Sequence, residues 1–344
     1  MKRIQVENNM YPDLSHTLQT SFDYGTSALS KANDKERPKS VFLLGHPLQQ
    51  SLAPLVHNTL FMNQHLPWTY TALESKKTQD LLDRFGDTCI GAAVTMPHKI
   101  SFIALVDELT PEGAAIGAIN TVFIRQDQTG KKRYIGTNTD CIGIREAFLN
   151  SPCVDPDILR DNLSSSPRPA LIIGAGGACR SAIYALHRWL GVQVIYIVNR
   201  VRSEVEDIIS SFRRVREFSA TIRFVSEVDE ARTLPVPFLV VGTVPNYPPS
   251  TLEEITASEC VRGLMARPGS KDKGVVLEMC YHPTIRTAFY DFAEENGWTV
   301  IPGTETMIWQ GVVQQILWTE SMDVLESTSF IEDIRRLIAE HLAN

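Results

Sequence analysis

A glycine-rich turn between a buried strand and a helix constrains the fold of this chain more than any other feature. The segment ALIIGAGGACRSAIYALHRWL begins at residue 170, and a second apolar run, QVIYIVNR, follows at residues 193–200. A strand, a glycine turn, a helix and a second strand in this order are typical of the βαβ unit of a dinucleotide-binding sheet. The sequence therefore predicts a Rossmann-like α/β domain, and a tight turn in an unrelated α/β sheet is the alternative.

The glycine turn also predicts where a cofactor binds. Gly174 permits the tight turn, and Gly176 lets the backbone approach a pyrophosphate at the helix N-terminus, where amide donors and the helix dipole favour anions. The third small position of the usual fingerprint falls on Cys179, whose side chain is compact. The predicted cofactor-binding turn comprises Gly174, Ala175, Gly176, Gly177 and Ala178.

The end of the second strand indicates which dinucleotide is bound. An acidic residue at this point binds the ribose 2′-hydroxyl of NAD, whereas an arginine accommodates the 2′-phosphate of NADP. The strand ends in Asn199 and Arg200, and the first acidic residue after it is Glu204. The sequence therefore favours NADP, with NAD as the alternative, and predicts that Asn199 and Arg200 contact the cofactor.

Strand-like and helical segments alternate on both sides of a polar stretch at residues 151–169, whose Pro, Ser and Asp residues mark a domain boundary. This alternation predicts two α/β domains, with ligands in a cleft at the carboxyl ends of the strands. The expected parts are a polar N-terminal extension (1–38), a substrate-binding catalytic domain (39–150), a Rossmann-like domain (151–303) and C-terminal helices that pack back on the catalytic domain (304–344).

Composition excludes several classes of partner. The net charge of −7 argues against nucleic acid and anionic membranes, which favour clustered positive charge. No apolar run approaches the roughly 18 residues of a membrane helix, and the N-terminus lacks the apolar core of a signal peptide. The six cysteines are scattered without metal-ligand spacing, so we expect reduced thiols, no metal and a cytoplasmic location. The oligomeric state cannot be inferred from the sequence.

Seven motifs follow one another along the chain: GHPLQQSLAPLVHN (45–58), GAAVTMPHK (91–99), GAINTV (117–122), GTNTDCIG (136–143), GAGGACR (174–180), EMCYHP (278–283) and GTETMIWQG (303–311). Together they resemble the ordered motif set of shikimate and quinate dehydrogenases. The resemblance runs from about residue 41 to 320, and the GTETMIWQG form near the C-terminus is closest to fungal-type quinate dehydrogenases. It implies reversible NAD(P)-linked oxidation of shikimate or quinate to the 3-dehydro ketone.

A lysine and an aspartate in these motifs could carry the chemistry, because alcohol–ketone interconversion needs a group that moves the hydroxyl proton. Lys99 follows the strand GAAVT, and Pro97 is expected in the first turn of a helix there. Asp140 lies at a predicted loop-to-helix junction, where a carboxylate is electrostatically favoured. Taken singly, a surface lysine and a helix N-cap would explain them. The resemblance implies instead that Lys99 is the acid/base group and Asp140 its partner.

The resemblance also assigns binding roles. Ser51 and Tyr281 would lie at the ring carboxylate, and the ring hydroxyls would contact Thr95, Asn120 and Gln310. Taken alone, Ser51 and Asn120 could equally be turn or capping residues. The residues implied to line the nicotinamide pocket are Thr243, Val244 and Gly303.

Departures from the family pattern leave the substrate open. Ala53 stands where the family places a second hydroxyl residue, and a hydrogen bond to a carboxylate is worth roughly 1.5–3 kcal/mol. Its loss should weaken a carboxylate substrate by about tenfold or more, or it indicates another ring substituent. Shikimate, quinate and related cyclohexane acids remain candidates. The other departures are Ala93 for Asn, Val241 for Asn and Glu278 for Asp.

Two other functions are compatible with parts of the sequence. One is a regulatory sensor that binds the same metabolites without reacting, although such proteins usually carry further domains. The other is a dehydrogenase of the same fold that acts on another substrate class, such as folate-linked one-carbon units. Cofactor-dependent oxidation of a ring acid would distinguish the enzyme that we expect from both.

Overall fold

A computed structural model describes residues 14–29, 33–164, 168–266, 273–326 and 330–343. The described chain divides into two compact units. We call residues up to Ile142 together with those from Met307 the substrate unit, and Gly143–Thr306 the Rossmann unit. No helix in the described ranges is both long and apolar enough to cross a membrane.

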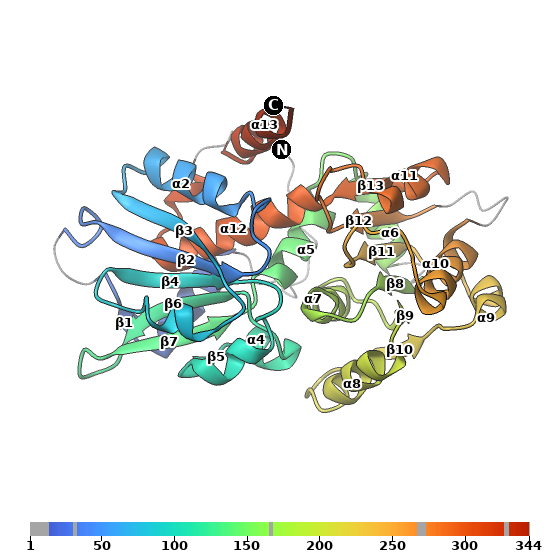
Figure 1. The fold of residues 1–344 in the computed structure, drawn as a ribbon, viewed down its shortest axis with the longest axis horizontal. Coiled ribbons are helices and arrows are strands. Elements are labelled where there is room, and N and C mark those ends of the chain that lie inside the picture. The colour runs from blue at the N-terminus through green and yellow to red at the C-terminus, as the bar shows by residue number, and fades with distance from the viewer. Residues whose placement is uncertain (1–13, 30–32, 165–167, 267–272, 327–329, 344) are drawn as a thin grey trace. The chain divides into compact units, whose positions relative to one another are not determined.

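The substrate unit contains a mixed sheet of seven strands, in which β2 pairs in parallel with β3 and β4, while β6 pairs antiparallel with β4 and β7 (Figure 1). Along the sheet the order is β3 (Trp68–Glu74), β2 (Lys39–Gly45), β4 (Cys89–Val94), β6 (Thr121–Gln126), β7 (Lys132–Thr137) and β5 (Glu108–Leu109), with β1 (Thr26–Ser27) also paired to β6.

Helices and apolar side chains complete this unit. One core cluster joins β2, β4 and β6 through residues such as Leu44, Val94 and Val122, all at most 1% exposed. The helices are α1 (Leu14–Ser21), α2 (Ala53–Asn63), α3 (Gln79–Leu82), α4 (Pro111–Ile116), the start of α5 (Asp140–Asn150), most of α12 (Gly303–Thr319) and α13 (Phe330–Ala343).

Helix α12 is fixed against the sheet by a buried indole. Trp318 donates from Nε1 to the carbonyl oxygen of Val122 on β6, at 3.0 Å. A Cβ atom at Gly91 on β4 would lie 2.3 Å from the same Nε1 atom. The absence of a side chain at Gly91 therefore allows the helix to approach the sheet, which places its polar residues against the ends of β4 and β6.

The N-terminal segment is part of this unit. Strand β1 pairs antiparallel with β6, and the guanidinium of Arg125 on β6 is buried beneath the segment. Arg125 donates to the carbonyl and hydroxyl oxygens of Ser21 and pairs with Glu320 at 3.2 Å. Burial lowers the pKa of Arg125 to about 10. Glu320, which follows α12, also accepts from the backbone amide of Ala28 at 2.9 Å. One carboxylate therefore connects the segment around β1 with Arg125 of β6 and with the end of α12.

The Rossmann unit has a six-stranded sheet in which every pairing is parallel (Figure 1). The central strands read as apolar runs, as expected for a parallel sheet covered on both faces. This confirms the predicted fold class. The order is β10 (Thr221–Phe224), β9 (Val194–Val198), β8 (Ala170–Ile173), β11 (Leu239–Gly242), β12 (Val275–Glu278) and β13 (Thr299–Pro302).

Strand order reverses between β8 and β11, because the chain proceeds outward from β8 to β10 and then returns to β11. In open α/β sheets, ligands bind beyond the carboxyl ends of the strands at such a reversal. The glycine turn after β8 lies at this point. The helices of the unit are α6 (Pro156–Ser164), α7 (Gly177–Tyr184), α8 (Arg202–Phe212), α9 (Val228–Thr233), α10 (Leu252–Met265) and α11 (Ala288–Glu295).

Candidate active site

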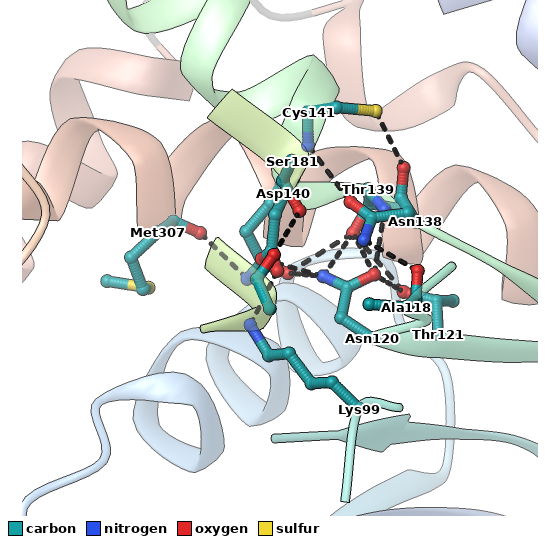
Figure 2. Close-up of polar contacts among 12 residues, drawn as sticks. Lys99, Ala118, Asn120, Thr121, Asn138, Thr139, Asp140, Cys141, Ser181 and Met307 are labelled. Atoms are coloured by element: carbon teal, nitrogen blue, oxygen red, sulfur yellow. Dashed lines mark hydrogen bonds and ion pairs between the residues drawn. The ribbon is translucent and has the colours of Figure 1, made fainter. Parts of the chain in front are cut away.

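Lys99 and Asp140 are in direct contact in the substrate unit. The Lys99 ammonium lies 2.5 Å from Oδ2 of Asp140, and the two side chains are 18% and 9% exposed (Figure 2). Asp140 is the first residue of α5, as the sequence predicted, so its carboxylate lies at the helix N-terminus where the dipole favours negative charge. The pair is a largely buried cation and anion with limited access to solvent.

The local structure around Lys99 differs from the expectation. We expected Pro97 in the first turn of a helix, with Lys99 near its N-terminus. Instead, residues 96–100 form turns, and a short 3-10 helix begins only at Ser101. The carbonyl oxygen of Lys99 accepts a hydrogen bond from the backbone amide of Ile119 at 2.8 Å. This contact with the segment before β6 holds the turn in place, and an α-helix would redirect that carbonyl.

Asn120 links the pair to the rest of the site. Its Nδ2 atom donates to Oδ1 of Asp140 at 2.9 Å (Figure 2). The same Nδ2 atom lies within hydrogen-bond distance of Oε1 of Gln310, at 3.2 Å. Its Oδ1 atom accepts from the backbone amide of Thr139 at 2.7 Å. Segments far apart in the sequence thus bring Lys99, Asp140, Asn120 and Gln310 together, four of the residues that the motifs predicted.

The other predicted substrate-unit residues follow neighbouring parallel strands. Thr95 directly follows β4, and Ser51 lies six residues after β2 in the connection to α2. Both side chains are partly exposed, and Ser51 Oγ accepts from the amide of Ala53 at 3.4 Å. Because β2 and β4 are parallel neighbours, their carboxyl ends share an edge of the sheet, so a ligand at this edge can contact both segments.

Two further predicted residues lie in the Rossmann unit. Tyr281 follows β12 and is partly buried, with its ring 4.1 Å from that of His282. Gly303 is buried after β13, and a Cβ atom there would lie 2.4 Å from the carbonyl oxygen of Met279. Only glycine therefore permits this close approach of the segments that follow β12 and β13.

The glycine turn has the geometry of a phosphate cradle. Gly174 adopts a φ of 109°, and a Cβ atom there would lie 2.6 Å from the Thr243 hydroxyl and 2.9 Å from the side chain of Val244. Gly176 is the exposed N-cap of α7, with open space at its Cβ position and no side-chain cap. The first amides of α7 therefore remain available to an anion, which fits a dinucleotide pyrophosphate.

The segment after β9 lies beside a surface hollow of about 660 Å³. The Arg200 side chain is 59% exposed and pairs with Glu254, the residue that closes the capping box of α10. Asn199 donates to the carbonyl oxygen of Val201 at 2.9 Å and to Glu204 at 2.8 Å. The hollow is lined by Arg200, Val201, Arg202, Ser203, Glu206, Thr251 and Glu253.

Comparison with known proteins identifies the family. A quinate dehydrogenase from Emericella nidulans is 40% identical over 322 residues, which cover 90% of this chain and 95% of the relative. The chain belongs to the shikimate/quinate dehydrogenase family. Residues 43–122 also match the shikimate dehydrogenase substrate binding domain. The expected family and enzyme class, an NAD(P)-dependent dehydrogenase of the shikimate and quinate type, are thereby confirmed.

Solved structures of the shikimate/quinate dehydrogenase family share the fold. Shikimate 5-dehydrogenase from Thermus thermophilus, in complex with NADP(H) and shikimate, is 26% identical with a TM-score of 0.62, covering 87% of this chain and 99% of that chain. The dehydroquinate dehydratase and shikimate dehydrogenase from S. pombe, AroM, is 31% identical with a TM-score of 0.64. That match covers 83% of this chain and 51% of the AroM chain.

The sequence marks Glu278 only as a departure from the family pattern, in which an Asp is common at this position. It did not predict that the side chain is buried. The carboxyl is 2% exposed at the end of β12, and its Oε1 atom accepts from the Thr287 hydroxyl at 3.1 Å. Among the described residues, its Oε2 atom has no hydrogen-bond partner. Burial raises the pKa of Glu278 to about 8, so the side chain is largely neutral at pH 7. An acidic residue at the end of an apolar strand was the available signal.

Among the described residues, no group of three or more His, Cys, Asp or Glu side chains is arranged to hold a metal ion. The six cysteines are free thiols, and burial raises the pKa of Cys179, beside the glycine turn, to about 12. This compact, buried thiol packs as a small apolar residue at the third position of the glycine fingerprint.

Proposed function

We propose that this chain oxidises a hydroxyl of quinate, or of a closely similar ring acid, with Lys99 as the proton acceptor and Asp140 as its partner. The contact of 2.5 Å between the Lys99 ammonium and the Asp140 carboxylate carries this proposal. The identity of 40% to a quinate dehydrogenase supports quinate as the substrate.

The geometry of the pair supports these proposed roles. Oxidation breaks the C–H and O–H bonds of the carbinol, so the hydride and the proton need separate acceptors. A bound NAD(P)⁺ supplies the acceptor for the hydride. Lys99 takes the hydroxyl proton in its neutral amine form and becomes an ammonium, whose charge the buried carboxylate of Asp140 balances while it holds the side chain in place. In the reverse direction the same lysine donates the proton.

The amides and hydroxyls nearby would position the ring. Asn120 and Gln310 offer amide groups beside the catalytic pair, which suits contacts to the ring hydroxyls, and Thr95 is proposed for the same role. We assign Ser51 to the ring carboxylate, since its partly exposed hydroxyl follows β2. Tyr281 is proposed as a further carboxylate contact. Ala53 is only 9% exposed and brings no hydroxyl, which removes one carboxylate contact.

The Rossmann unit would hold the cofactor. The turn from Gly174 to Ala178 is the proposed pyrophosphate site, and Thr243, Val244 and Gly303 the proposed nicotinamide contacts. We propose NADP rather than NAD as the preferred cofactor. The exposed guanidinium of Arg200, with Asn199 before it, supports this preference, because it lies at the end of β9 where a 2′-phosphate would be recognised.

Substituting Arg200 with alanine should lower the preference for NADP. A charge-assisted hydrogen bond is worth roughly 1.5–3 kcal/mol, so kcat/KM with NADP should fall about 10- to 100-fold while that with NAD changes little. Steady-state kinetics with both cofactors measures the ratio. Glu254→Gln is the matched control, because it breaks the ion pair and keeps the guanidinium. Equal kinetics with NADP and NAD, unchanged by Arg200→Ala, would refute the assignment.

A substrate panel tests the function as a whole. Quinate, shikimate and analogues are each incubated with NAD or NADP at alkaline pH, and formation of the reduced nicotinamide is followed by absorbance. We expect turnover with ring acids and the highest kcat/KM with quinate. No turnover with any ring acid would reject the proposal and favour a metabolite sensor or a different substrate class.

A further inference from the structure

A line of side-chain hydrogen bonds leads from the catalytic pair into the core of the substrate unit. Gln314 on α12 donates from Nε2 to the hydroxyl oxygen of Thr121, at 2.9 Å. Thr121 in turn donates to Oδ1 of Asn120, also at 2.9 Å, and Asn120 donates to Oδ1 of Asp140 (Figure 2). Gln314 and Thr121 are 2% and 0% exposed, so water cannot easily replace either partner.

Each bond in this line fixes the direction of the next. Because Gln314 donates to the Thr121 hydroxyl, that hydroxyl is left to donate its own proton to Asn120 Oδ1. The Oδ1 atom of Asn120 accepts from Thr121 and also from the backbone amide of Thr139 at 2.7 Å, so the Asn120 amino group faces Asp140. The opposite orientation of Asn120 would set its carbonyl oxygen against the carboxylate. The Oδ2 atom of Asp140 is then the one that faces Lys99.

Gln314 is itself oriented by a buried imidazole. Nε2 of His57 lies 3.2 Å from Oε1 of Gln314. His57 is enclosed between Tyr70, stacked at 4.5 Å, and Trp318 at 5.1 Å. Burial lowers the pKa of His57 to about 4, so at neutral pH the ring is uncharged and carries one N–H. The other ring nitrogen, Nδ1, lies 3.3 Å from Oε1 of Gln315, so the single N–H serves one of two oxygens. We assign the proton to Nε2, because His57 then donates to Oε1 of Gln314, whose amino group points toward Thr121.

We propose that Gln314, held by His57, is a positioning residue for the reaction: through Thr121 it supplies a second donor to Asn120 Oδ1, beside the amide of Thr139, and thereby holds Asn120 and Asp140 in the arrangement that faces Lys99. This inference rests on the proposed roles of Lys99 and Asp140. Neither Gln314 nor His57 touches the pair. Their contribution is to hold one orientation of a neighbouring amide, at the end of a chain of buried donors and acceptors.

Shape-matched variants test the positioning role. Gln314→Met keeps the length of the side chain and removes its donor, and Thr121→Val keeps the shape and removes the hydroxyl. Each should lower kcat about 10- to 100-fold, as small misplacements of catalytic groups do. The dissociation constant of NADP, measured by titration, should stay unchanged. Thr121→Ser retains the hydroxyl and should keep most of the activity.

Controls separate positioning from packing. Thr319→Val removes another buried hydroxyl of α12, whose one bond within the described residues is to the carbonyl oxygen of Gln315 in the same helix, and kcat should be unaffected. The double variant Gln314→Met/Thr121→Val should lose little more than either single variant, since both break one line. Thermal melting of each variant confirms that the compared proteins are folded.

Two results would overturn the inference. One is an unchanged kcat in Gln314→Met, and the other is an equal loss of kcat in Thr319→Val. Failure of the underlying function is distinguishable, because Lys99→Ala would then retain turnover. With an inactive Lys99→Ala and a fully active Gln314→Met, the catalytic pair stands and the positioning role falls.

Discussion

Replacing Lys99 with alanine should nearly abolish turnover and leave cofactor binding intact. The substitution removes the only cation in contact with Asp140 in the described chain, and with it the proposed proton acceptor. General acid–base catalysis contributes roughly 10²- to 10⁴-fold, so kcat should fall by a factor in this range. The glycine turn lies in the other unit, so the dissociation constant of NADP should hardly change. Steady-state kinetics and a cofactor titration provide both numbers.

Two further variants define the role of the pair. Lys99→Met retains the aliphatic stem without the ammonium and should be as inactive as Lys99→Ala, which separates the proton transfer from packing. Asp140→Asn keeps the lysine, removes the balancing charge and should retain partial activity. Turnover at the parental rate in Lys99→Met would show that another group accepts the proton.

Replacing Glu278 with glutamine should make the protein more stable at alkaline pH. The pKa of this carboxyl is raised from 4.5 to about 8 in the folded chain, because burial disfavours the charged form. Between these values the unfolded carboxyl is ionised while the folded one keeps its proton. Unfolding therefore releases a proton, and the free energy of unfolding falls as pH rises toward 8. At 1.36 kcal/mol per pKa unit, the loss is at most roughly 5 kcal/mol.

Denaturant unfolding between pH 4 and 9 measures this effect. The parent protein should lose stability across the interval, whereas Glu278→Gln should show a flatter profile and exceed the parent above pH 8. Below pH 4.5 the two should be similar, since both side chains are neutral. Glu259→Gln, at an exposed carboxylate of α10, is the control and should follow the parent. A parallel pH profile for Glu278→Gln and the parent would disprove the neutral buried carboxyl.

The Rossmann half was well predicted because its signals are local. An apolar strand, a glycine turn and a helix are contiguous, and β8, Gly174 and α7 lie where this pattern put them. The turn around Lys99 was not predictable in the same way. Its conformation depends on a hydrogen bond from the backbone amide of Ile119 to the carbonyl oxygen of Lys99. The residues next to Lys99 in the sequence give no sign of this contact.

The contact of Lys99 with Asp140 was predicted from the motifs, since no spacing rule joins residues 99 and 140. The line of hydrogen bonds that leads from Gln314 to Asp140 was not predicted, although Gln310 and Gln314 are four residues apart and therefore share a face of α12. That spacing, with Asn120 and Thr121 adjacent in one motif, was the available signal. Sequence could not show that His57 is enclosed by Tyr70, because this contact joins α2 to β3 through the tertiary fold.

The division of the chain has a consequence for the order of events during synthesis. Among the residues that the structure describes, the Rossmann unit comes from one stretch, Gly143–Thr306, so it can fold on the ribosome as soon as residue 306 has emerged. The other unit is split, and its sheet lacks Trp318, Gln314 and the Glu320 partner of Arg125 until residues 314–320 have been translated. A nascent chain interrupted before that point would have a finished cofactor half and an uncovered, aggregation-prone substrate half.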